Sequence, residues 1–428
     1  MGFWLRLLST SVLLTVSAAT PTVPDAVQQP SLASTTPLPP SQDPFYTAPP
    51  NYELAAPGAV LRVRPAPGNL STIIGNCSAA YNILYRTTDG RYRPSWAVTT
   101  LFVPKSSNKS ALVSYQIPYN SADVDASPSY ALYGNSLASD INDNIPDALG
   151  RGWYLNVPDF QGPLASFTLG PQEGHATLDS VRAVLSSGFG LANNARYALW
   201  GYSGGGLAVD WAAELQEAYA PELNFAGAAL GGLTPSVLAT LDEATGTYFT
   251  GLIPMAVLGI TSQYPEAYDY IYSRLKPTGS HNRTTFLLGK NITLEEAFTE
   301  FQGQDGFSYF VGGRADLDAP IMQKIFNNTG IMGNHGIPQM PLFVYKAIND
   351  ELSAVQATDS LVNKYCSLDA NILYQRNTVG GHIAEITNGE DRAFTWLTSV
   401  LDGTYSKLYS TKGCTIQDVT VNITSSTL

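Results

Sequence analysis

Residues 197–219 read YALWGYSGGGLAVDWAAELQEAY, and this stretch predicts a strand, a tight turn and a helix in direct succession. Its first four residues, Tyr197 to Trp200, are aromatic and apolar, as in a buried β-strand. The Gly-rich turn leads into an apolar, Ala-rich segment from Gly205 to Tyr219 that ends before Pro221, which is typical of a buried helix. A strand joined to a helix in this way is the unit from which parallel sheets are built.

The turn itself has the pattern G-x-S-x-G, from Gly201 through Ser203 to Gly205. In a nucleophile elbow, a sharp turn between strand and helix lifts the Ser hydroxyl above the sheet, and small neighbours avoid clashes. With 37 Gly in the chain the bare pattern is weak, and the alternative is a Gly-rich turn around a buried Ser. The strand and helix on either side favour Ser203 as a catalytic nucleophile.

Further β-rich runs alternate with helical patterns on both sides of this stretch. The predicted strands are 81–86, 97–103, 112–117, 153–157, 197–200, 225–230, 342–348 and 372–375. The alternation predicts an α/β fold, with a mostly parallel central sheet and helices on both faces. Between the strands at 225–230 and 342–348 the chain instead reads as helices and loops, with candidate helices at 265–275 and 293–301. We expect this insertion to form a helical cap over the active site.

Composition divides the chain into four parts. Residues 1–19 have a positive charge, a short apolar run and small residues at the end, as in a secretory signal peptide; the apolar run is too short for a membrane anchor. Residues 20–60 are rich in Pro, Ser, Thr and Ala and predict an extended arm. Residues 61–232 and 337–428 are the predicted catalytic domain, and 233–336 the predicted cap.

A Ser hydroxyl needs a base to remove its proton, and in α/β-hydrolases the chain order is Ser, then acid, then His. Only His382 follows Ser203 outside the predicted cap; the other His residues are His175, His281 and His335. His382 comes after two glycines that suggest a flexible loop, and the alternative is an ordinary surface His. Glu385 makes the pattern H-x-x-E, but without a second His nearby we expect no metal site and no cofactor.

The acid should follow a strand between Ser203 and His382. Asp350 ends the strand at 342–348, whereas Asp359 and Asp369 belong to the next helix or its exit, where solvated side chains are common. Asp350 would hold the His tautomer and stabilise the imidazolium. For the oxyanion we expect two donors, the backbone N–H of Gly204 and the side chain of Asn120.

Charge and composition exclude several classes of function. The net charge of −12 and the pI near 4.7 argue against a nucleic-acid partner. No later segment is long and apolar enough to span a bilayer, so we expect no stable membrane insertion. The apolar run 251–260 is either a packed cap helix or a wall of an acyl-binding pocket.

Cysteines and sequons agree with export. There are three Cys, so at most one disulfide forms, and by position we favour Cys366 with Cys414, leaving Cys77. Seven Asn-x-Ser/Thr sequons are glycosylation candidates: Asn69, Asn76, Asn108, Asn282, Asn291, Asn327 and Asn422.

Four motifs give the chain a resemblance to a known family. They are residues 201–205 (GYSGG), 219–224 (YAPELN) with Gly231-Gly232, 347–351 (AINDE), and 382–385 (HIAE). With these motifs the sequence resembles the fungal secretory lipase family, the lipase A type of Candida yeasts. The resemblance implies an α/β-hydrolase with a large helical cap, a triad of Ser203, Asp350 and His382, and a disulfide from Cys366 to Cys414. Two departures are Asn120, where that type has an Asp donor, and Ala126, at the first position of a second disulfide.

The sequence therefore predicts a secreted, monomeric serine carboxylic-ester hydrolase that cleaves triacylglycerols or other lipid esters through an acyl-enzyme. Transient contact with a lipid interface through the cap would accompany this activity. A second hypothesis is an esterase that deacylates a small fungal secondary metabolite. A third, from another class, is a catalytically silent hydrolase fold used for binding, against which the intact Ser, Asp and His argue.

Overall fold

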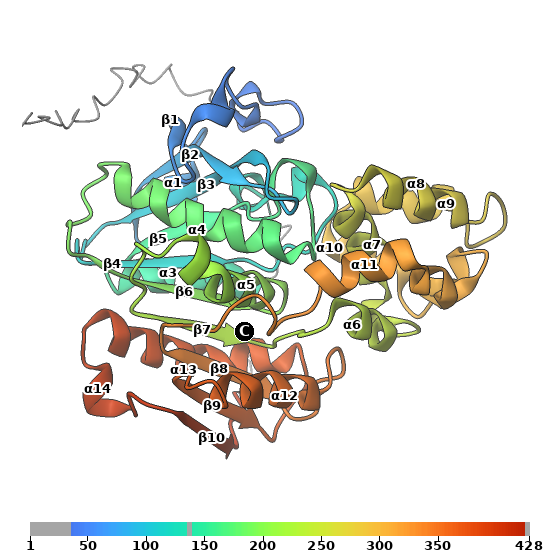
Figure 1. Cartoon of the computed structure of the whole chain (residues 1–428). Helices are drawn as coiled ribbons and strands as arrows, with labels where there is room; N and C mark the ends of the chain where they lie inside the picture. The colour runs from blue at the N-terminus through green and yellow to red at the C-terminus, as the bar shows by residue number, and fades with distance from the viewer. Residues whose placement is uncertain (1–35, 135–138, 424–428) are drawn as a thin grey trace, which may run out of the picture.

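The computed structural model describes residues 36–134 and 139–423 (Figure 1). The predicted signal peptide and the first part of the arm lie outside the described residues. One sheet runs through the molecule, and its strands are β1 Val60–Pro65, β2 Cys77–Thr88, β3 Pro94–Pro104, β4 Ala111–Gln116, β5 Tyr154–Pro158, β6 Arg196–Tyr202, β7 Gly227–Gly231, β8 Leu342–Ala347, β9 Ile372–Asn377 and β10 Cys414–Val419.

The prediction of a mostly parallel sheet is confirmed. The strand order is β1-β2-β3-β5-β4-β6-β7-β8-β9-β10. All pairs from β5 to β10 are parallel, while β1, β2 and β3 form an antiparallel end that joins β5 through β3. Consecutive parallel strands place their carboxyl ends at one edge, where ligands bind in open α/β sheets.

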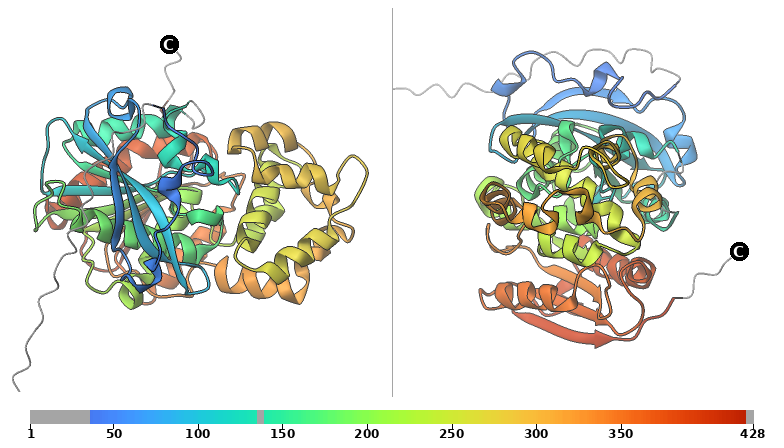
Figure 2. Two further views of the ribbon diagram at one scale, coloured as in Figure 1. Left: turned by 90° about the horizontal axis from the view of Figure 1, so that it is seen from above. Right: turned by 90° about the vertical axis from the view of Figure 1, so that its right-hand side faces the viewer.

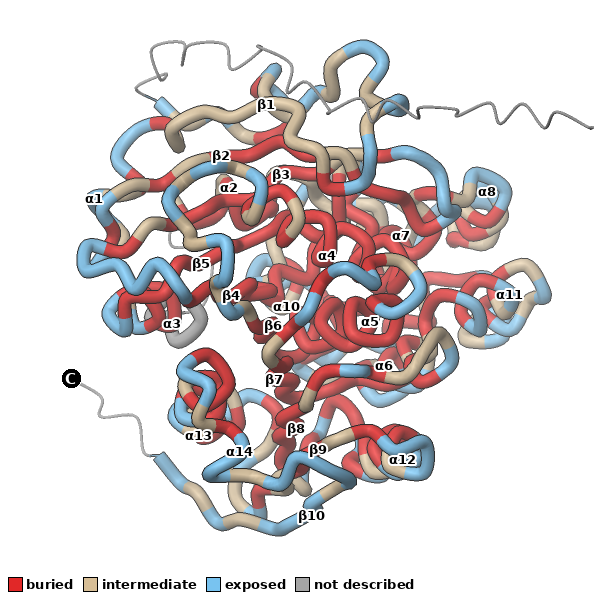
Figure 3. Tube along the Cα trace, turned by 60° about the vertical axis from the view of Figure 1, so that its left-hand side comes forward, coloured by how far each residue is buried: buried red, intermediate tan, exposed pale blue. Residues whose placement is uncertain are grey.

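Helices cover both faces of the sheet, as Figure 3 shows around its buried central column of strands. α4 (Gly170–Ser186), α5 (Gly204–Tyr219) and α12 (Val355–Cys366) lie on one face, and α3 (Ser139–Gly150) and α13 (Ala384–Leu401) on the other. The short helices are α1 Leu70–Ile73, α2 Pro128–Ala131 and α14 Tyr405–Leu408. The predicted helix at 205–219 thus belongs to α5.

The chain between β7 and β8 forms a group of helices beside the carboxyl edge of the sheet (Figures 1 and 2). The helices of this inserted segment are α6 Val237–Ala244, α7 Leu252–Thr261, α8 Pro265–Arg274, α9 Arg283–Phe286, α10 Leu294–Phe301 and α11 Pro320–Thr329. α10, at the predicted helix 293–301, begins with a capping box in which Thr293 and Glu296 exchange hydrogen bonds. All of these helices fall within the predicted cap, 233–336.

The described part of the Pro-rich arm packs against the antiparallel end of the sheet. Arg62 donates hydrogen bonds to the carbonyls of Pro44 and Thr47, at 3.0 and 2.7 Å. The indole of Trp96 on β3 donates to the carbonyl of Tyr46 at 2.8 Å. The segment 36–59 thus has no strand of its own, and side chains of the sheet bind its backbone carbonyls.

β1 and β10 lie at the two ends of the sheet, and the sequence analysis identified neither as a strand. Every residue of β1 is only partly buried, and the inner residues of β10 are exposed, so their apolar pattern is weak. β10 is tied to α12 by a disulfide between Cys366 and Cys414. Cys77 is buried at the start of β2 as a free thiol.

Asp159 is a buried carboxyl group directly after β5, with 4% of its surface exposed. It accepts hydrogen bonds from the backbone N–H and the hydroxyl of Ser129, at 2.9 and 2.6 Å. Burial raises the pKa of Asp159 to about 7, because these two hydrogen bonds do not replace its lost hydration. Burial also raises the pKa values of Glu173 and Asp210.

We expect the buried carboxyl groups of Asp159, Glu173 and Asp210 to make the folded protein more stable at about pH 5 than at about pH 7.5. Together they outweigh the opposite effect of the buried ring of His175, whose pKa burial lowers to about 4. Between the pKa of an unfolded Asp, about 3.9, and the folded value of Asp159, the folded state binds more protons, so the free energy of unfolding falls as pH rises. Asp159→Asn should weaken this dependence, as measured by thermal unfolding midpoints at several pH values. A midpoint that rises steadily from pH 5 to 7.5 would contradict the prediction.

Candidate active site

Three strands carry the predicted triad to one edge of the sheet. Ser203 directly follows β6, Asp350 lies in the turn after β8, and His382 lies in the turn after β9. These strands run parallel, with β7 between β6 and β8. Their carboxyl ends therefore meet, and the three side chains come together although 179 residues separate Ser203 from His382.

Ser203 occupies a strained turn between β6 and α5, with φ 53° and ψ −121°. A positive φ is costly for a residue with a Cβ and is typical of functional sites. The next two residues are glycines. A Cβ at Gly205 would lie 1.9 Å from the backbone carbonyl oxygen of Gln116, and one at Gly204 would lie 1.9 Å from Asn120 Oδ1 and displace that side chain. The geometry is that of a nucleophile elbow.

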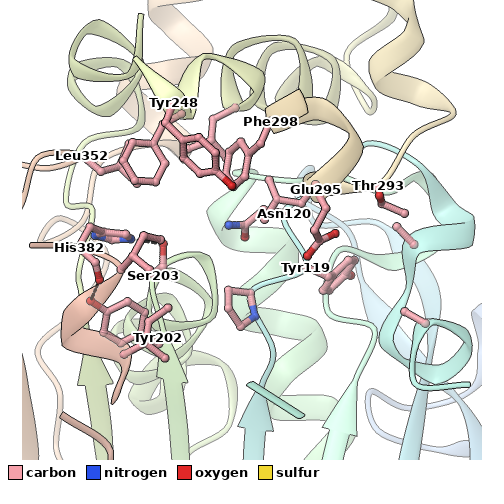
Figure 4. Close-up of a pocket in the computed structure, with 18 residues that line it drawn as sticks. Tyr119, Asn120, Tyr202, Ser203, Tyr248, Thr293, Glu295, Phe298, Leu352 and His382 are labelled. Carbon is pink, nitrogen blue, oxygen red and sulfur yellow. Dashed lines mark hydrogen bonds between the residues drawn. The ribbon is translucent and has the colours of Figure 1, made fainter. Parts of the chain in front are cut away.

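A chain of two hydrogen bonds links the three side chains, and Figure 4 shows the one between Ser203 and His382. His382 Nε2 lies 2.9 Å from Ser203 Oγ, and His382 Nδ1 lies 2.8 Å from Asp350 Oδ2. His382 is 2% exposed and Ser203 8%, so both are shielded from bulk water. These distances are those at which an imidazole can take a proton from a hydroxyl while a carboxylate orients its ring.

Asp350 is held by more partners than the sequence indicated. Its Oδ1 accepts the backbone N–H groups of Leu352 and Ser353, both at 2.9 Å. Its Oδ2, which faces His382, also accepts a bond from the buried ammonium of Lys346 at 2.8 Å. Burial opposes ionisation, but the hydrogen bonds and charges of His382 and Lys346 outweigh it and hold the pKa of Asp350 well below its usual range. The carboxylate is thus charged at neutral pH.

The loop that carries His382 is fixed, in contrast to the flexible loop that its two glycines suggested. The hydroxyl of Tyr202 donates to the carbonyl of His382 at 2.6 Å, and the backbone N–H of His382 donates to Glu351 Oε2 at 2.8 Å. A Cβ at Gly381 would lie 2.0 Å from that same Glu351 oxygen. Gly381 therefore serves close approach, and the imidazole is positioned before substrate binds.

The other histidines have structural partners. The ring of His175 lies between those of Tyr92 and Tyr219, with centroids 5.0 and 4.2 Å away. His281 hydrogen-bonds Ser308, and His335 packs on the indole of Trp211.

The acidic residues outside the predicted triad pair with other groups or face solvent. Asp359 lies in α12, where it pairs with Arg376 at 3.3 Å, and Asp369 is exposed after that helix. Glu385 is buried and bound by Asn377 and Arg392. Over residues 36–134 and 139–423, no cluster of three or more His, Cys, Asp or Glu side chains could hold a metal ion.

Asn120 lies beside Ser203, at the end of the loop after β4, and adopts a positive φ of 41°. Its Oδ1 is buried without a hydrogen-bond partner next to Gly204. In Figure 4 its amide nitrogen points towards Ser203. An N–H group in that place can donate to an oxyanion that forms on the carbon bound to Ser203.

We expect Asn120→Ala to lower kcat about 10² to 10³-fold, because one donor to the oxyanion is lost. The thermal unfolding midpoint should fall only slightly, since Oδ1 has no partner to lose but Ala adopts the positive φ of 41° less readily than Asn. Steady-state kinetics and a melting curve measure the two effects. An unchanged kcat would mean that backbone N–H groups supply all donors and that Asn120 only shapes the loop.

Two cavities meet at Ser203. The large cavity has a volume of about 350 Å³, and its aromatic wall includes Tyr248, Phe249 and Phe298 from the inserted segment. The small cavity has a volume of about 30 Å³ and lies between the start of α5 and helices α6 and α7. Asn120, Ser203, Leu252 and Leu352 border both cavities.

The apolar run 251–260 is mainly a packed helix. Every residue of α7 is buried, and of its residues only Leu252 and Ala256 border a cavity at Ser203. Leu258, 1% exposed, packs near Gly289 away from both cavities. Pro254 sits in the first turn of α7, where its missing N–H costs no helical hydrogen bond.

The seven sequons differ in exposure. Asn282 is partly buried and caps α9 through its side chain. The other six, Asn69, Asn76, Asn108, Asn291, Asn327 and Asn422, are exposed.

Sequence comparisons connect the chain with esterases and lipases. The model of a family described as secretory lipase matches residues 138–407. A trichothecene C-3 esterase of Fusarium sporotrichioides is 49% identical over 410 residues, which cover 92% of this chain and 91% of the relative. A protein named probable trichothecene esterase, from Stachybotrys chartarum, is 45% identical, with 90% and 81% covered. Lipase A of Arthroderma benhamiae is 36% identical, with 90% and 83% covered.

Solved structures give the same fold. Candida antarctica lipase A in its closed state matches with a TM-score of 0.80 and 28% identity, over 90% of this chain and 91% of that one. The rice cell wall degrading esterase LipA from Xanthomonas oryzae matches with a TM-score of 0.65 at 16% identity, over 82% and 100% of the two chains, which is a likeness of fold alone.

Proposed function

The chain belongs to the secretory lipase family and is an ester hydrolase, and we propose that it works through Ser203, His382 and Asp350 on acyl esters of a compact alcohol. The observation that carries the catalytic part is the unbroken chain of hydrogen bonds from Ser203 Oγ through His382 to Asp350, below a preformed cavity.

The reaction proceeds through an acyl-enzyme. Ser203 Oγ attacks the ester carbonyl carbon as its proton moves to His382 Nε2, and the oxyanion accepts hydrogen bonds from Gly204 N–H and Asn120. The bond from carbon to the alcohol oxygen then breaks, and that oxygen takes the proton from His382. Water attacks the acyl-enzyme with His382 as base, and the carboxylic acid and Ser203 are released.

The relatives and the large cavity favour a compact alcohol over a triacylglycerol. The two relatives at 49% and 45% identity are named trichothecene esterases, whereas the lipase relative shares 36%. A cavity of about 350 Å³ suits one small polycyclic molecule. Its lining includes the carboxylate of Glu295, which a triacylglycerol has no N–H or O–H donor to engage. We therefore place the small-metabolite esterase before the lipase.

An alcohol series at constant acyl group tests this proposal. The purified protein would be given an acetylated trichothecene, 4-nitrophenyl acetate and emulsified triacetin, and kcat/KM would be compared. We expect the highest value for the acetylated trichothecene. A higher value for triacetin, with a rise at the emulsion interface, would support the lipase instead.

We expect Glu295→Gln to raise KM about tenfold for an ester whose alcohol part carries a free hydroxyl, with kcat nearly unchanged. A hydrogen bond from a hydroxyl to a carboxylate becomes weaker when a neutral amide replaces the carboxylate. Glu300→Gln is the matched control, since Glu300 is exposed on the same helix and borders neither cavity. 4-Nitrophenyl acetate has no such hydroxyl. If Glu295→Gln raised KM for this substrate as much as for the hydroxyl-bearing ester, the role of Glu295 would be contradicted.

Secretion and a monomeric state belong to the same proposal. The family is described as secretory, and residues 1–19 have the pattern of a signal peptide. Among the described residues, none of the helices is long and apolar enough to cross a bilayer. Recovery of the protein from culture medium with a new N-terminus near residue 20, as a monomer carrying N-glycans, is the expected result. Transient contact with a lipid interface through 233–336 would appear as activation by emulsified substrate.

A further inference from the structure

The small cavity beside Ser203 has a mostly apolar wall. Phe167 precedes α4, Val237 and Leu241 come from α6, and Leu252 and Ala256 come from α7. All five side chains are at most 5% exposed. This cavity is therefore an apolar recess that opens at the nucleophile.

The two cavities differ in which parts of the catalytic machinery they touch. His382 borders the large cavity only, whereas Gly204 borders the small cavity only. Ser203 and Asn120 border both. The group that would donate the proton, His382, and the backbone N–H of Gly204 thus border different cavities, which share Ser203.

Because the two cavities border different catalytic groups, an ester can bind productively in only one direction. The alcohol oxygen must receive its proton from His382 Nε2 when the carbon–oxygen bond breaks, so the alcohol part must lie on the side of His382. The carbonyl oxygen lies between Gly204 N–H and Asn120. The third substituent of the carbonyl carbon, the acyl chain, is left on the side that touches Ser203 and Gly204 but not His382.

We propose that the small cavity is the acyl site and the large cavity the alcohol site, so that the enzyme releases short acyl groups, acetyl foremost. This inference rests on the proposed function and adds the side on which each half of the ester binds. A cavity needs a volume of about 10–15 Å³ to hold one water molecule, which is similar in size to a methyl group. The small cavity, at about 30 Å³, therefore admits an acetyl methyl with little room beyond it. Each added methylene must push aside packed side chains of α6, α7 or Phe167, which is unfavourable in a close-packed interior.

The test varies the acyl group while the alcohol stays the same. The enzyme would be assayed with 4-nitrophenyl acetate, butyrate and hexanoate, and kcat/KM measured for each. We expect a loss of about tenfold or more from acetate to butyrate, and a further loss to hexanoate. Equal or rising values along the series, still abolished by Ser203→Ala, would overturn the acyl-site assignment while leaving the proposed function intact. Hydrolysis that is unaffected by Ser203→Ala would instead overturn the proposed function.

Two substitutions change the small cavity in opposite directions. Leu241→Ala removes part of its wall, and the ratio of butyrate to acetate kcat/KM should rise about tenfold. Ala256→Val fills it, and hydrolysis of acetate should fall about tenfold or more. Each variant can be judged alone if the other does not fold.

Leu258→Ala is the control because Leu258 is equally buried on α7 but borders neither cavity. It should leave the acyl ratio at the wild-type value even where it lowers the melting temperature. If Leu258→Ala shifted the ratio as much as Leu241→Ala, general loosening of the inserted segment would explain the effect and the assignment would be wrong.

Discussion

Ser203→Ala should lower ester hydrolysis by about 10⁵-fold or more while leaving the fold intact. The loss follows because no acyl-enzyme can form without the hydroxyl that lies 2.9 Å from His382 Nε2. The fold should persist because Ala is smaller than Ser and the turn is fixed by other groups, including the bond from the backbone N–H of residue 203 to the carbonyl of Gly231 at 2.9 Å. The measurement is kcat/KM on 4-nitrophenyl acetate together with a melting curve.

Ser367→Ala is the matched control, since Ser367 is an exposed serine at the end of α12. It should retain full activity. A fluorophosphonate should label wild-type protein on the peptide that contains Ser203 and should not label Ser203→Ala. Retention of more than a few per cent of activity in Ser203→Ala would exclude Ser203 as the nucleophile.

Asp350→Asn is expected to have the second largest effect, a loss of about 10⁴-fold in kcat. The neutral amide can present an N–H to His382 Nδ1 and so favour the tautomer that cannot accept the proton of Ser203. It also leaves the buried ammonium of Lys346 without its charged partner, so this variant should be less stable than the wild type.

Two further variants separate catalysis from stability. Asp369→Asn should change neither property, because Asp369 is exposed and its positive φ of 65° is one that Asn adopts readily. Asp350→Asn combined with Lys346→Met removes both buried charges and should recover much of the lost stability but none of the activity. Activity in that double variant near the wild-type level would show that Asp350 is not the acid.

The features that could be predicted from the sequence are local in the chain. The elbow around Ser203, the helices that follow it and the capping box at Thr293 depend on residues within a few positions of one another. The same holds for the strands of the parallel sheet, whose buried runs are continuous and apolar. The order of Ser, acid and His then left few candidates, because the chain has only four His.

The features that were missed depend on distant parts of the chain. β1 and β10 are strands through backbone bonds to a neighbouring strand, and their own side chains carry little apolar pattern. Lys346 was overlooked because a lone Lys in a strand gives no sign that its ammonium will meet Asp350. The run 251–260 was left open between a packed helix and a pocket wall because a uniformly apolar run does not tell which side faces a cavity.

The sequence by itself thus determined the chemistry that the chain can carry, since residue types, their chain order and the local turn geometry are written in short segments. Only the tertiary structure decided which cavity each of these groups borders. Whether His382 and Gly204 border the same cavity beside Ser203 or different ones depends on how β9, α5 and the inserted helices pack, and packing is settled by contacts between residues far apart in the chain. The volumes left on the two sides, about 350 and about 30 Å³, are set by the same contacts.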